Sequence, residues 1–270
     1  MKKIISFLVL AILLTGCKPA VTTPVKAENL RILSLVTCAD YIMTELGTKD
    51  KIVAIDRHGR LLDSMQNVPV TVAGGVVSRE MLRKYRINYA IIWYYQRNLL
   101  ELFNKEQIPV MVVEPVSLTN YPELVRKLGE LCGKTAAAES LVEHFTGAFP
   151  PAASTQKGGV PVYIELYAPW KSPSANGYIA EIMQRAGGQL TAAGTQGGTV
   201  SPEVVALARV EVIFFVEGFG SAAEIAGRAA LRNTPAVKNK RIFAIPRKLV
   251  CEGVAPEELL NFFSNKIKDK

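Results

Sequence analysis

The chain has 270 residues, of which 49% are hydrophobic, and a formal net charge of +8. Its basic residues are scattered rather than grouped, which excludes the dense basic patch of a nucleic-acid-binding protein, so we expect no nucleic-acid partner. Only two histidines are present, and no G-x-S-x-G, P-loop or H-E-x-x-H motif occurs. We therefore expect no enzyme.

The first 29 residues are expected to export and tether the protein. Two lysines precede an apolar run, residues 4–14, that is too short to span a bilayer. The tetrapeptide that ends in Cys17 resembles the lipobox of bacterial lipoproteins, whose cysteine carries a diacylglycerol after cleavage. We expect a signal peptide at 1–16, a lipid anchor on Cys17 and a tether at 17–29, which hold the chain on the outer face of a bacterial cell membrane. An ordinary signal peptide that happens to contain a cysteine is the alternative.

Residues 30–117 alternate between apolar strands and helices. The expected strands are 32–36, 52–55, 70–72, 89–93 and 109–113, and the expected helices run to residue 47 and over 78–85 and 98–106. Continuous apolar strands that alternate with helices predict a mostly parallel sheet covered on both faces.

The segment 118–152 is rich in Leu, Glu, Lys and Ala and ends at two prolines. We expect it to form one connecting helix of about 30 residues, roughly 45 Å long. A second α/β unit follows over 153–270, with strands at 160–164, 212–216 and 241–245 and helices at 178–186 and 256–268. The sequence thus predicts two α/β lobes joined by one long helix, with a ligand cleft between them at the strand ends.

Several short segments occur in a fixed order across the two lobes. They are Arg31 to Leu35, Gly74-Gly75, Ser78 to Glu80, Asn88 to Ile92, Ile108 to Val110, Gly187-Gly188, Val200 to Glu203 and Leu231 to Phe243. Their order and spacing over residues 30–268 resemble the class III periplasmic binding proteins, which include the vitamin B12, iron-siderophore and haem carriers of ABC importers. Asn88 departs from the Pro-Asp pair that the family usually has before the strand.

The resemblance implies a binding function without an intrinsic cofactor. The chain would capture an iron complex or tetrapyrrole (a ferric siderophore, haem or a corrinoid) and deliver it to a permease dimer with its ATPase subunits. Glu80 and Glu203, one per lobe near a helix start, match the acidic residues that meet permease arginines in the family. Their location also fits simple helix capping.

The same matching gives candidate residues for the cleft. Cys38 and His58 fall where vitamin B12 carriers contact their ligand, whereas Gly74 and Gly197 replace tryptophans. The remaining candidates are Trp93, Tyr94, Trp170, Cys251 and Glu252 at strand ends, and Arg57, Arg60 and Arg247 for carboxylates or the charge of a ferric complex.

These candidates have other interpretations. The aromatic residues could belong to the core, and the arginines could lie on the surface. Cys38, His58 and Cys251 could ligate a metal, with His58 reaching the metal of a bound chelate, or could be buried thiols beside a polar loop. The mature chain has three cysteines, the third being Cys132, so at least one thiol is free of an internal disulfide. A free zinc or manganese ion as ligand, or an enzyme acting on a chelate, are the alternative functions.

Overall fold

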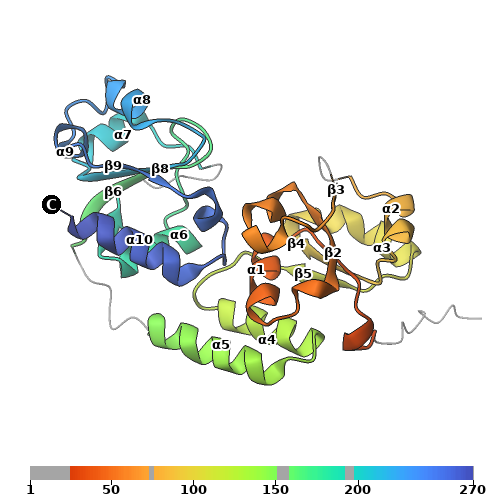
Figure 1. Ribbon diagram of the computed structural model, residues 1–270. Helices are drawn as coiled ribbons and strands as arrows, with labels where there is room; N and C mark the ends of the chain where they lie inside the picture. The colour runs from red at the N-terminus through yellow and green to blue at the C-terminus, as the bar shows by residue number, and fades with distance from the viewer. Residues whose placement is uncertain (1–24, 73–75, 151–157, 192–197, 270) are drawn as a thin grey trace, which may run out of the picture.

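Figure 1 shows the computed structural model of the chain, which describes residues 25–72, 76–150, 158–191 and 198–269. Two α/β lobes lie side by side, and the helices α4 and α5 lie below the region where the lobes meet. The predicted two-lobed fold with parallel sheets is confirmed. Cys17, Gly74 and Gly197 lie outside the described residues.

The N-terminal lobe is built on a five-stranded parallel sheet in the order β3-β2-β1-β4-β5. Its strands are β1 (Ile32–Ser34), β2 (Ile52–Asp56), β3 (Val70–Val72), β4 (Tyr89–Trp93) and β5 (Val110–Val113). Its helices are α1 (Thr37–Glu45), α2 (Arg79–Lys84) and α3 (Leu100–Lys105), with 3-10 turns η1 (Ala27–Asn29), η2 (Lys49–Lys51), η3 (Arg57–Leu61), η4 (Asp63–Met65) and η5 (Tyr94–Leu99). The strand order reverses between β1 and β4, and ligands of such sheets bind at this point, outside the carboxyl ends of the strands.

The C-terminal lobe has a four-stranded parallel sheet in the order β7-β6-β8-β9. Its strands are β6 (Val160–Glu165), β7 (Gly188–Leu190), β8 (Val212–Val216) and β9 (Ile242–Ile245). Its helices are α6 (Tyr178–Arg185), α7 (Pro202–Leu207), α8 (Ala222–Gly227), α9 (Pro235–Lys238) and α10 (Pro256–Lys268), with the turn η6 (Arg247–Val250). All five residues of β8 are buried, as expected for a strand covered on both faces. The edge strand β7 was not among the predicted strands.

The connection between the lobes is helical, but the prediction of one long helix is wrong. The chain forms α4 (Tyr121–Leu131) and α5 (Thr135–Ala148), which pack against each other. Gly133 separates them with a φ of +69°, a left-handed conformation that glycine adopts without strain. Gly129 allows the close approach, since a Cβ there would lie 2.3 Å from the Cβ of Ala138.

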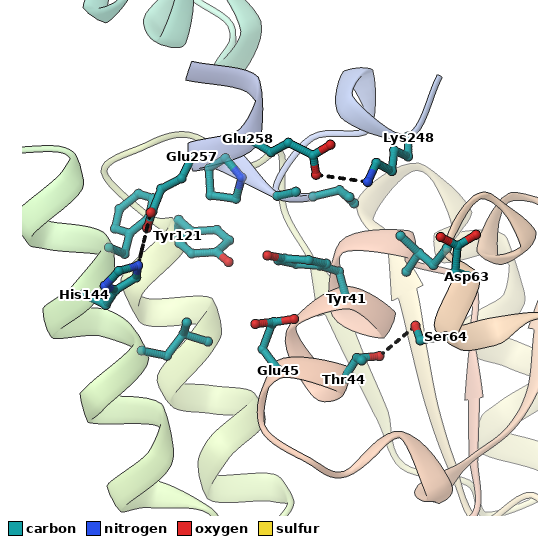
Figure 2. Close-up of a pocket in the computed structure, with 16 residues that line it drawn as sticks. Tyr41, Thr44, Glu45, Asp63, Ser64, Tyr121, His144, Lys248, Glu257 and Glu258 are labelled. Atoms are coloured by element: carbon teal, nitrogen blue, oxygen red, sulfur yellow. Dashed lines mark hydrogen bonds and ion pairs between the residues drawn. The ribbon is translucent and has the colours of Figure 1, made fainter. Parts of the chain in front are cut away.

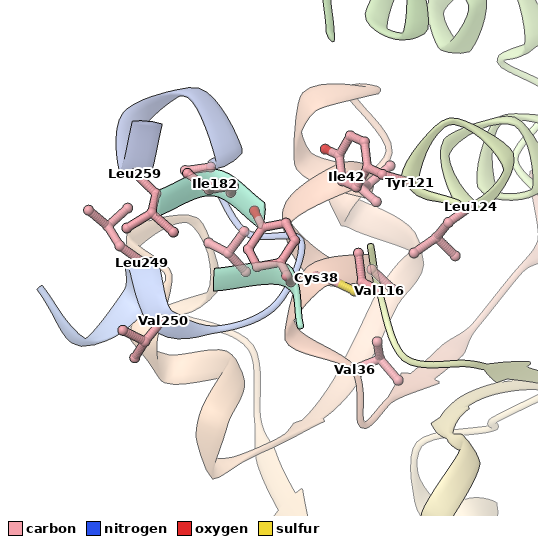
Figure 3. Close-up of a cluster of buried hydrophobic side chains, with 14 of the residues drawn as sticks. Val36, Cys38, Ile42, Val116, Tyr121, Leu124, Ile182, Leu249, Val250 and Leu259 are labelled. Carbon is pink, nitrogen blue, oxygen red and sulfur yellow. The ribbon is translucent and has the colours of Figure 1, made fainter. Parts of the chain in front are cut away.

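A single apolar core extends from one lobe into the other. Figure 3 shows part of it, with Ile42 of α1 and Leu124 of α4 on one side and Ile182 of α6 and Leu259 of α10 on the other. All four side chains are at most 9% exposed. Separation of the lobes would expose this apolar surface to water, so the core favours a fixed arrangement around the cleft.

Candidate functional site

A pocket of about 410 Å³ lies between the lobes, at the carboxyl ends of the strands of both sheets. We call it the cleft pocket. Its N-terminal side comes from the residues that follow β1, β2 and β4, and its C-terminal side from the loop after β6, the start of α6 and the segment 250–252. Parallel strands end at one edge of each sheet, so loops that are distant in the sequence meet here.

Three consecutive aromatic residues, the last of β4 and the two that follow it, line the N-terminal side of the cleft pocket. The rings of Trp93 and Tyr95 are stacked, with centroids 6.4 Å apart and an interplanar angle of 12°. Tyr94 meets Tyr95 edge to face at 5.3 Å. Tyr94 is 41% and Tyr95 66% exposed, although aromatic side chains favour burial. These rings therefore offer an apolar surface to a ligand.

Tyr167 lines the opposite side of the cleft pocket and is 47% exposed. Its ring meets that of Phe219 edge to face at 5.1 Å, and the guanidinium of Arg247 stacks on Phe219 at 5.0 Å. Burial raises the pKa of Tyr167 to about 12, so its hydroxyl stays protonated at neutral pH. The side chain can donate a hydrogen bond as well as pack against a ligand.

The acidic groups of the cleft pocket are Asp56 and Glu252. Asp56 caps the turn after β2, where its carboxylate accepts hydrogen bonds from the backbone N–H groups of His58 at 2.8 Å and Gly59 at 3.2 Å. Burial raises the pKa of Asp56, and the nearby His58 opposes this rise. Burial also raises the pKa of Glu252, and that of the Cys251 thiol to about 11. The cleft pocket therefore combines aromatic surface with acidic groups that are partly shielded from water.

Five of the ten residues predicted for the cleft line this pocket. They are His58, Trp93, Tyr94, Cys251 and Glu252. Asp56 and Tyr178 also line it and were not predicted. Tyr95 and Tyr167 line it as well, and for these two the sequence left a core role and a cleft role equally open. The position of Asp56 at the carboxyl end of a strand is a signal that could have identified it.

The other five predicted residues do not line the cleft pocket. Cys38 is fully buried beneath Gly253, where a Cβ would come within 2.9 Å of the Cys38 Cβ. Arg57 is exposed, and Arg60 approaches the Met65 carbonyl at 3.4 Å.

Trp170 and Arg247 are held by partners of their own. Trp170 lies against Tyr163, with ring centroids 6.2 Å apart, and under the guanidinium of Arg228 at 5.2 Å. Arg247 is stacked on Phe219 behind the pocket wall. These contacts keep both side chains out of the lining.

Cys38, His58 and Cys251, for which the sequence left open a metal-ligand set or buried thiols beside a polar loop, are not arranged as a metal-ligand set. Within the ranges that the structure describes, no three His, Cys, Asp or Glu side chains are placed to hold one metal ion. Cys38 is 0% exposed, and burial raises the pKa of its thiol well above the usual value. Cys38 is thus a packed thiol, whereas His58 is exposed at the cleft pocket.

Glu80 and Glu203 each lie in the first turn of a helix, α2 and α7. Ser78 and Ser201 cap these helices, and the Ser201 hydroxyl donates to Glu203 Oε2 at 2.6 Å, which lowers the pKa of Glu203. Both glutamates are exposed. Figure 1 places α2 and α7 on the side of the molecule opposite α4 and α5, one on each lobe.

Comparison with known sequences identifies the family. Residues 32–249 match the profile of the family described as "Periplasmic binding protein". The chain belongs to this family. Residues 1–17 match the profile "Prokaryotic membrane lipoprotein lipid attachment site", so this periplasmic binding protein is exported and lipid-anchored, as predicted. No curated protein matches the sequence.

Solved structures with the same fold share little sequence with this periplasmic binding protein. The heme-binding protein RhuT from Roseiflexus sp. RS-1 has 20% identity and a TM-score of 0.73, over 89% of this chain and 98% of that chain. The vitamin B12 binding protein BtuF of Vibrio cholerae has 18% identity and a TM-score of 0.71, and the match covers 88% of this chain and 96% of that chain. A periplasmic heme-binding protein from Pseudomonas aeruginosa has 16% identity and a TM-score of 0.75, and the match covers 88% of this chain and 92% of that chain.

The family also decides the general class of activity. Its members are substrate-binding transport proteins, and the prediction that the chain is not an enzyme is confirmed on this ground. Across the described part of the chain, no helix combines the length and apolar character needed to cross a membrane.

Proposed function

We propose that this protein is the substrate-binding lipoprotein of an ABC importer, and that it captures a tetrapyrrole or iron complex and delivers it to the permease dimer. The observation that carries the proposal is the cleft pocket, where exposed aromatic rings from the two lobes face one space of about 410 Å³. Flat aromatic surfaces bury a large planar ligand at a low cost in side-chain entropy. Similar structures described as heme- and vitamin B12-binding proteins support this ligand class.

The charge of the lining supports a tetrapyrrole of low net charge. Asp56 and Glu252 line the cleft pocket, and among the described lining residues there is no lysine or arginine. A trianionic ferric catecholate would meet these two carboxyl groups, whereas Arg247, whose charge opposes the rise that burial causes in the pKa values of Tyr167 and Cys251, is stacked on Phe219 outside the lining. Haem and corrinoids carry less net negative charge and present more apolar surface, so they suit this lining better.

His58 is the residue that we propose contacts the metal or a polar edge of the ligand. It is exposed and lines the cleft pocket, and its backbone N–H is held by Asp56 at 2.8 Å. This hydrogen bond fixes the backbone of the turn and leaves the imidazole free to turn toward a ligand. A neutral imidazole is a common axial ligand of haem iron.

Delivery to the permease is tested with Glu80 and Glu203. We expect Glu80→Ala combined with Glu203→Ala to remove most of the stimulation of the partner transporter's ATPase in reconstituted vesicles, because each lobe loses an exposed charge that could pair with a basic residue of the permease. Ligand affinity should stay unchanged, since neither residue lines the cleft pocket.

The matched control replaces two other exposed glutamates, Glu143 and Glu217, by Ala. Full stimulation is expected with this control. Full stimulation by the Glu80 and Glu203 variant would overturn the assignment of these residues as docking contacts.

A further inference from the structure

A second pocket, of about 430 Å³, lies between the lobes beside the connecting helices. We call it the rear pocket, and Figure 2 shows its lining. It receives side chains from α1, from the turns after β2, from α4 and α5, and from the start of α10. Its lining includes two tyrosines, Tyr41 and Tyr121, and four carboxylates, Glu45, Asp63, Glu257 and Glu258.

The rear pocket and the cleft pocket share three segments of chain. The helix α1 contributes Thr37 to the cleft pocket and Tyr41 to the rear pocket. The segment 56–64 contributes its first residues to the cleft pocket and its last to the rear pocket. In the segment 248–258, residues 250–252 line the cleft pocket, and Lys248 and residues 254–258 line the rear pocket. A molecule bound in the rear pocket therefore contacts the segments that shape the cleft pocket.

The rear pocket is acidic in a chain whose net charge is +8. Two of its four carboxylates are paired: Glu257 with His144 at 3.0 Å and Glu258 with Lys248 at 3.0 Å. Glu45 and Asp63 have no ion pair within the described residues. The local field thus favours a cation, while the net charge of the whole chain disfavours cation binding elsewhere.

A hydroxyl group that opens into the rear pocket has no partner among the described residues. Tyr121 is 2% exposed, and its hydroxyl makes no hydrogen bond with any residue that the structure describes. Figure 2 shows this hydroxyl directed into the pocket, toward the hydroxyl of Tyr41. The hydroxyl oxygen is not one of the fully buried polar atoms that lack a partner, so it is open to the pocket. The Tyr121 hydroxyl is thus placed to accept a hydrogen bond from a bound ligand.

The layout of the carboxylates indicates an extended cation. They stand on three separate segments, and no three acidic, histidine or cysteine side chains among the described residues are placed to hold one metal ion. The rings of Tyr121 and Phe145, with centroids 4.5 Å apart, add apolar surface to the lining. A chain of amines joined by methylene groups suits this lining, because its ammonium groups can pair with the carboxylates and its methylene groups can pack against the rings.

We propose that the rear pocket binds a linear aliphatic polyamine, whose ammonium groups pair with Glu45 and Asp63 and donate to the Tyr121 hydroxyl. Glu45 and Asp63 belong to the N-terminal lobe and Tyr121 to α4, so the bound polyamine lies beside the segments that the two pockets share. This inference is independent of which complex occupies the cleft pocket.

The test is a calorimetric titration of the full-length lipoprotein, in a neutral detergent at low ionic strength, with spermidine as the probe. We expect saturable binding of one spermidine per protein. Glu45→Gln combined with Asp63→Asn should weaken it by about tenfold, because both unpaired carboxylates are lost. Tyr121→Phe should weaken it by about tenfold, because a hydrogen bond to a charged donor is lost. Glu143→Gln, on the exposed face of α5, should leave it unchanged.

Three results would overturn the proposal. They are the absence of saturable spermidine binding, an equal loss with Glu143→Gln, and Mg²⁺ binding with the same dependence on Glu45 and Asp63. If Tyr121→Phe fails to fold, the double variant at the exposed Glu45 and Asp63 still tests the proposal, because unchanged spermidine binding by that variant would overturn it.

Discussion

At the scale of single residues, the carboxylate of Glu165 organises one side of the cleft. It is 1% exposed and accepts hydrogen bonds from the Tyr163 hydroxyl at 3.0 Å and the Trp170 backbone N–H at 2.9 Å, and it pairs with both terminal nitrogens of Arg228. Leu166 and Tyr167, which follow it in the chain, line the cleft pocket. Glu165 therefore fixes the start of a loop that lines the cleft pocket.

We expect Glu165→Gln to lower the free energy of unfolding by about 3 kcal/mol, because it leaves the partly buried guanidinium of Arg228 without its main counter-charge. Urea unfolding at neutral pH measures this change. Glu224→Gln is the control: this residue also pairs with Arg228, at 3.0 Å, but its side chain is 54% exposed, so its loss should cost less than about 1 kcal/mol. Equal effects of the two variants would show that burial does not determine the strength of this pair.

Asp40 gives the stability of the protein a specific pH dependence. It is 1% exposed, and its Oδ1 has no hydrogen-bond partner in the structure. Burial raises the pKa of Asp40 from 3.8 to about 8, with a smaller contribution from the charge of Asp56, while a hydrogen bond from Ser34 opposes the rise. Between these pH values the folded state holds a proton that the unfolded state releases, so the free energy of unfolding falls as the pH rises.

Wild type should lose stability between pH 5 and pH 8, whereas Asp40→Asn should not, because its amide has no proton to lose. The free energy of unfolding of Asp40→Asn minus that of wild type should therefore be larger at pH 8 than at pH 5 by at least about 1 kcal/mol. Urea unfolding at both pH values checks this. The exposed Asp63→Asn should show no such gain. A constant difference between Asp40→Asn and wild type would mean that Asp40 titrates in its ordinary range.

At the scale of elements, the contact between α4 and α5 depends on Gly129. We expect Gly129→Ala to destabilise the protein by about 2 kcal/mol, since the added methyl group would collide with Ala138. Gly147→Ala is the matched control, because this glycine also lies in a helix, α5, but has open space around it. It should stabilise the protein by up to about 1 kcal/mol. Thermal unfolding of both variants measures whether each change lowers or raises the stability. Stabilisation by Gly129→Ala would contradict the close packing of α4 against α5.

Some elements were predictable because local pattern and tertiary environment agree. The strand Tyr89–Trp93 and the helix Pro256–Lys268 have the predicted bounds. The break at Gly133 was hidden because residues of high helix propensity flank it on both sides, and only the packing of α4 against α5 requires the turn.

The candidate site was likewise predictable only in part. The predicted strand ends identified the loops that line the cleft pocket, but the direction of each side chain depends on partners that are distant in the sequence. Trp170 turns toward Tyr163 and Arg228, and Arg247 toward Phe219. No local pattern around Trp170 or Arg247 reveals these contacts.

At the scale of the whole molecule, one continuous core fixes the lobes around the cleft pocket, and a lipid anchors the chain to the membrane. The binding surface is therefore formed before the ligand arrives, which reduces the entropic cost of binding. The central claim is that aromatic residues of this preformed cleft pocket bind a tetrapyrrole.

The most direct test is a fluorescence titration of the Trp170→Phe variant, in which Trp93 is the only remaining tryptophan of the two in the chain. Haemin, cobalamin and a ferric tris-catecholate are added separately, and Trp93→Ala is titrated in parallel by absorbance. We predict that haemin or cobalamin quenches Trp93 saturably and binds more tightly than the catecholate. Trp93→Ala should weaken this binding by about thirtyfold, which corresponds to about 2 kcal/mol. Equal affinity of Trp93→Ala and wild type, or tightest binding of the catecholate, would contradict the account.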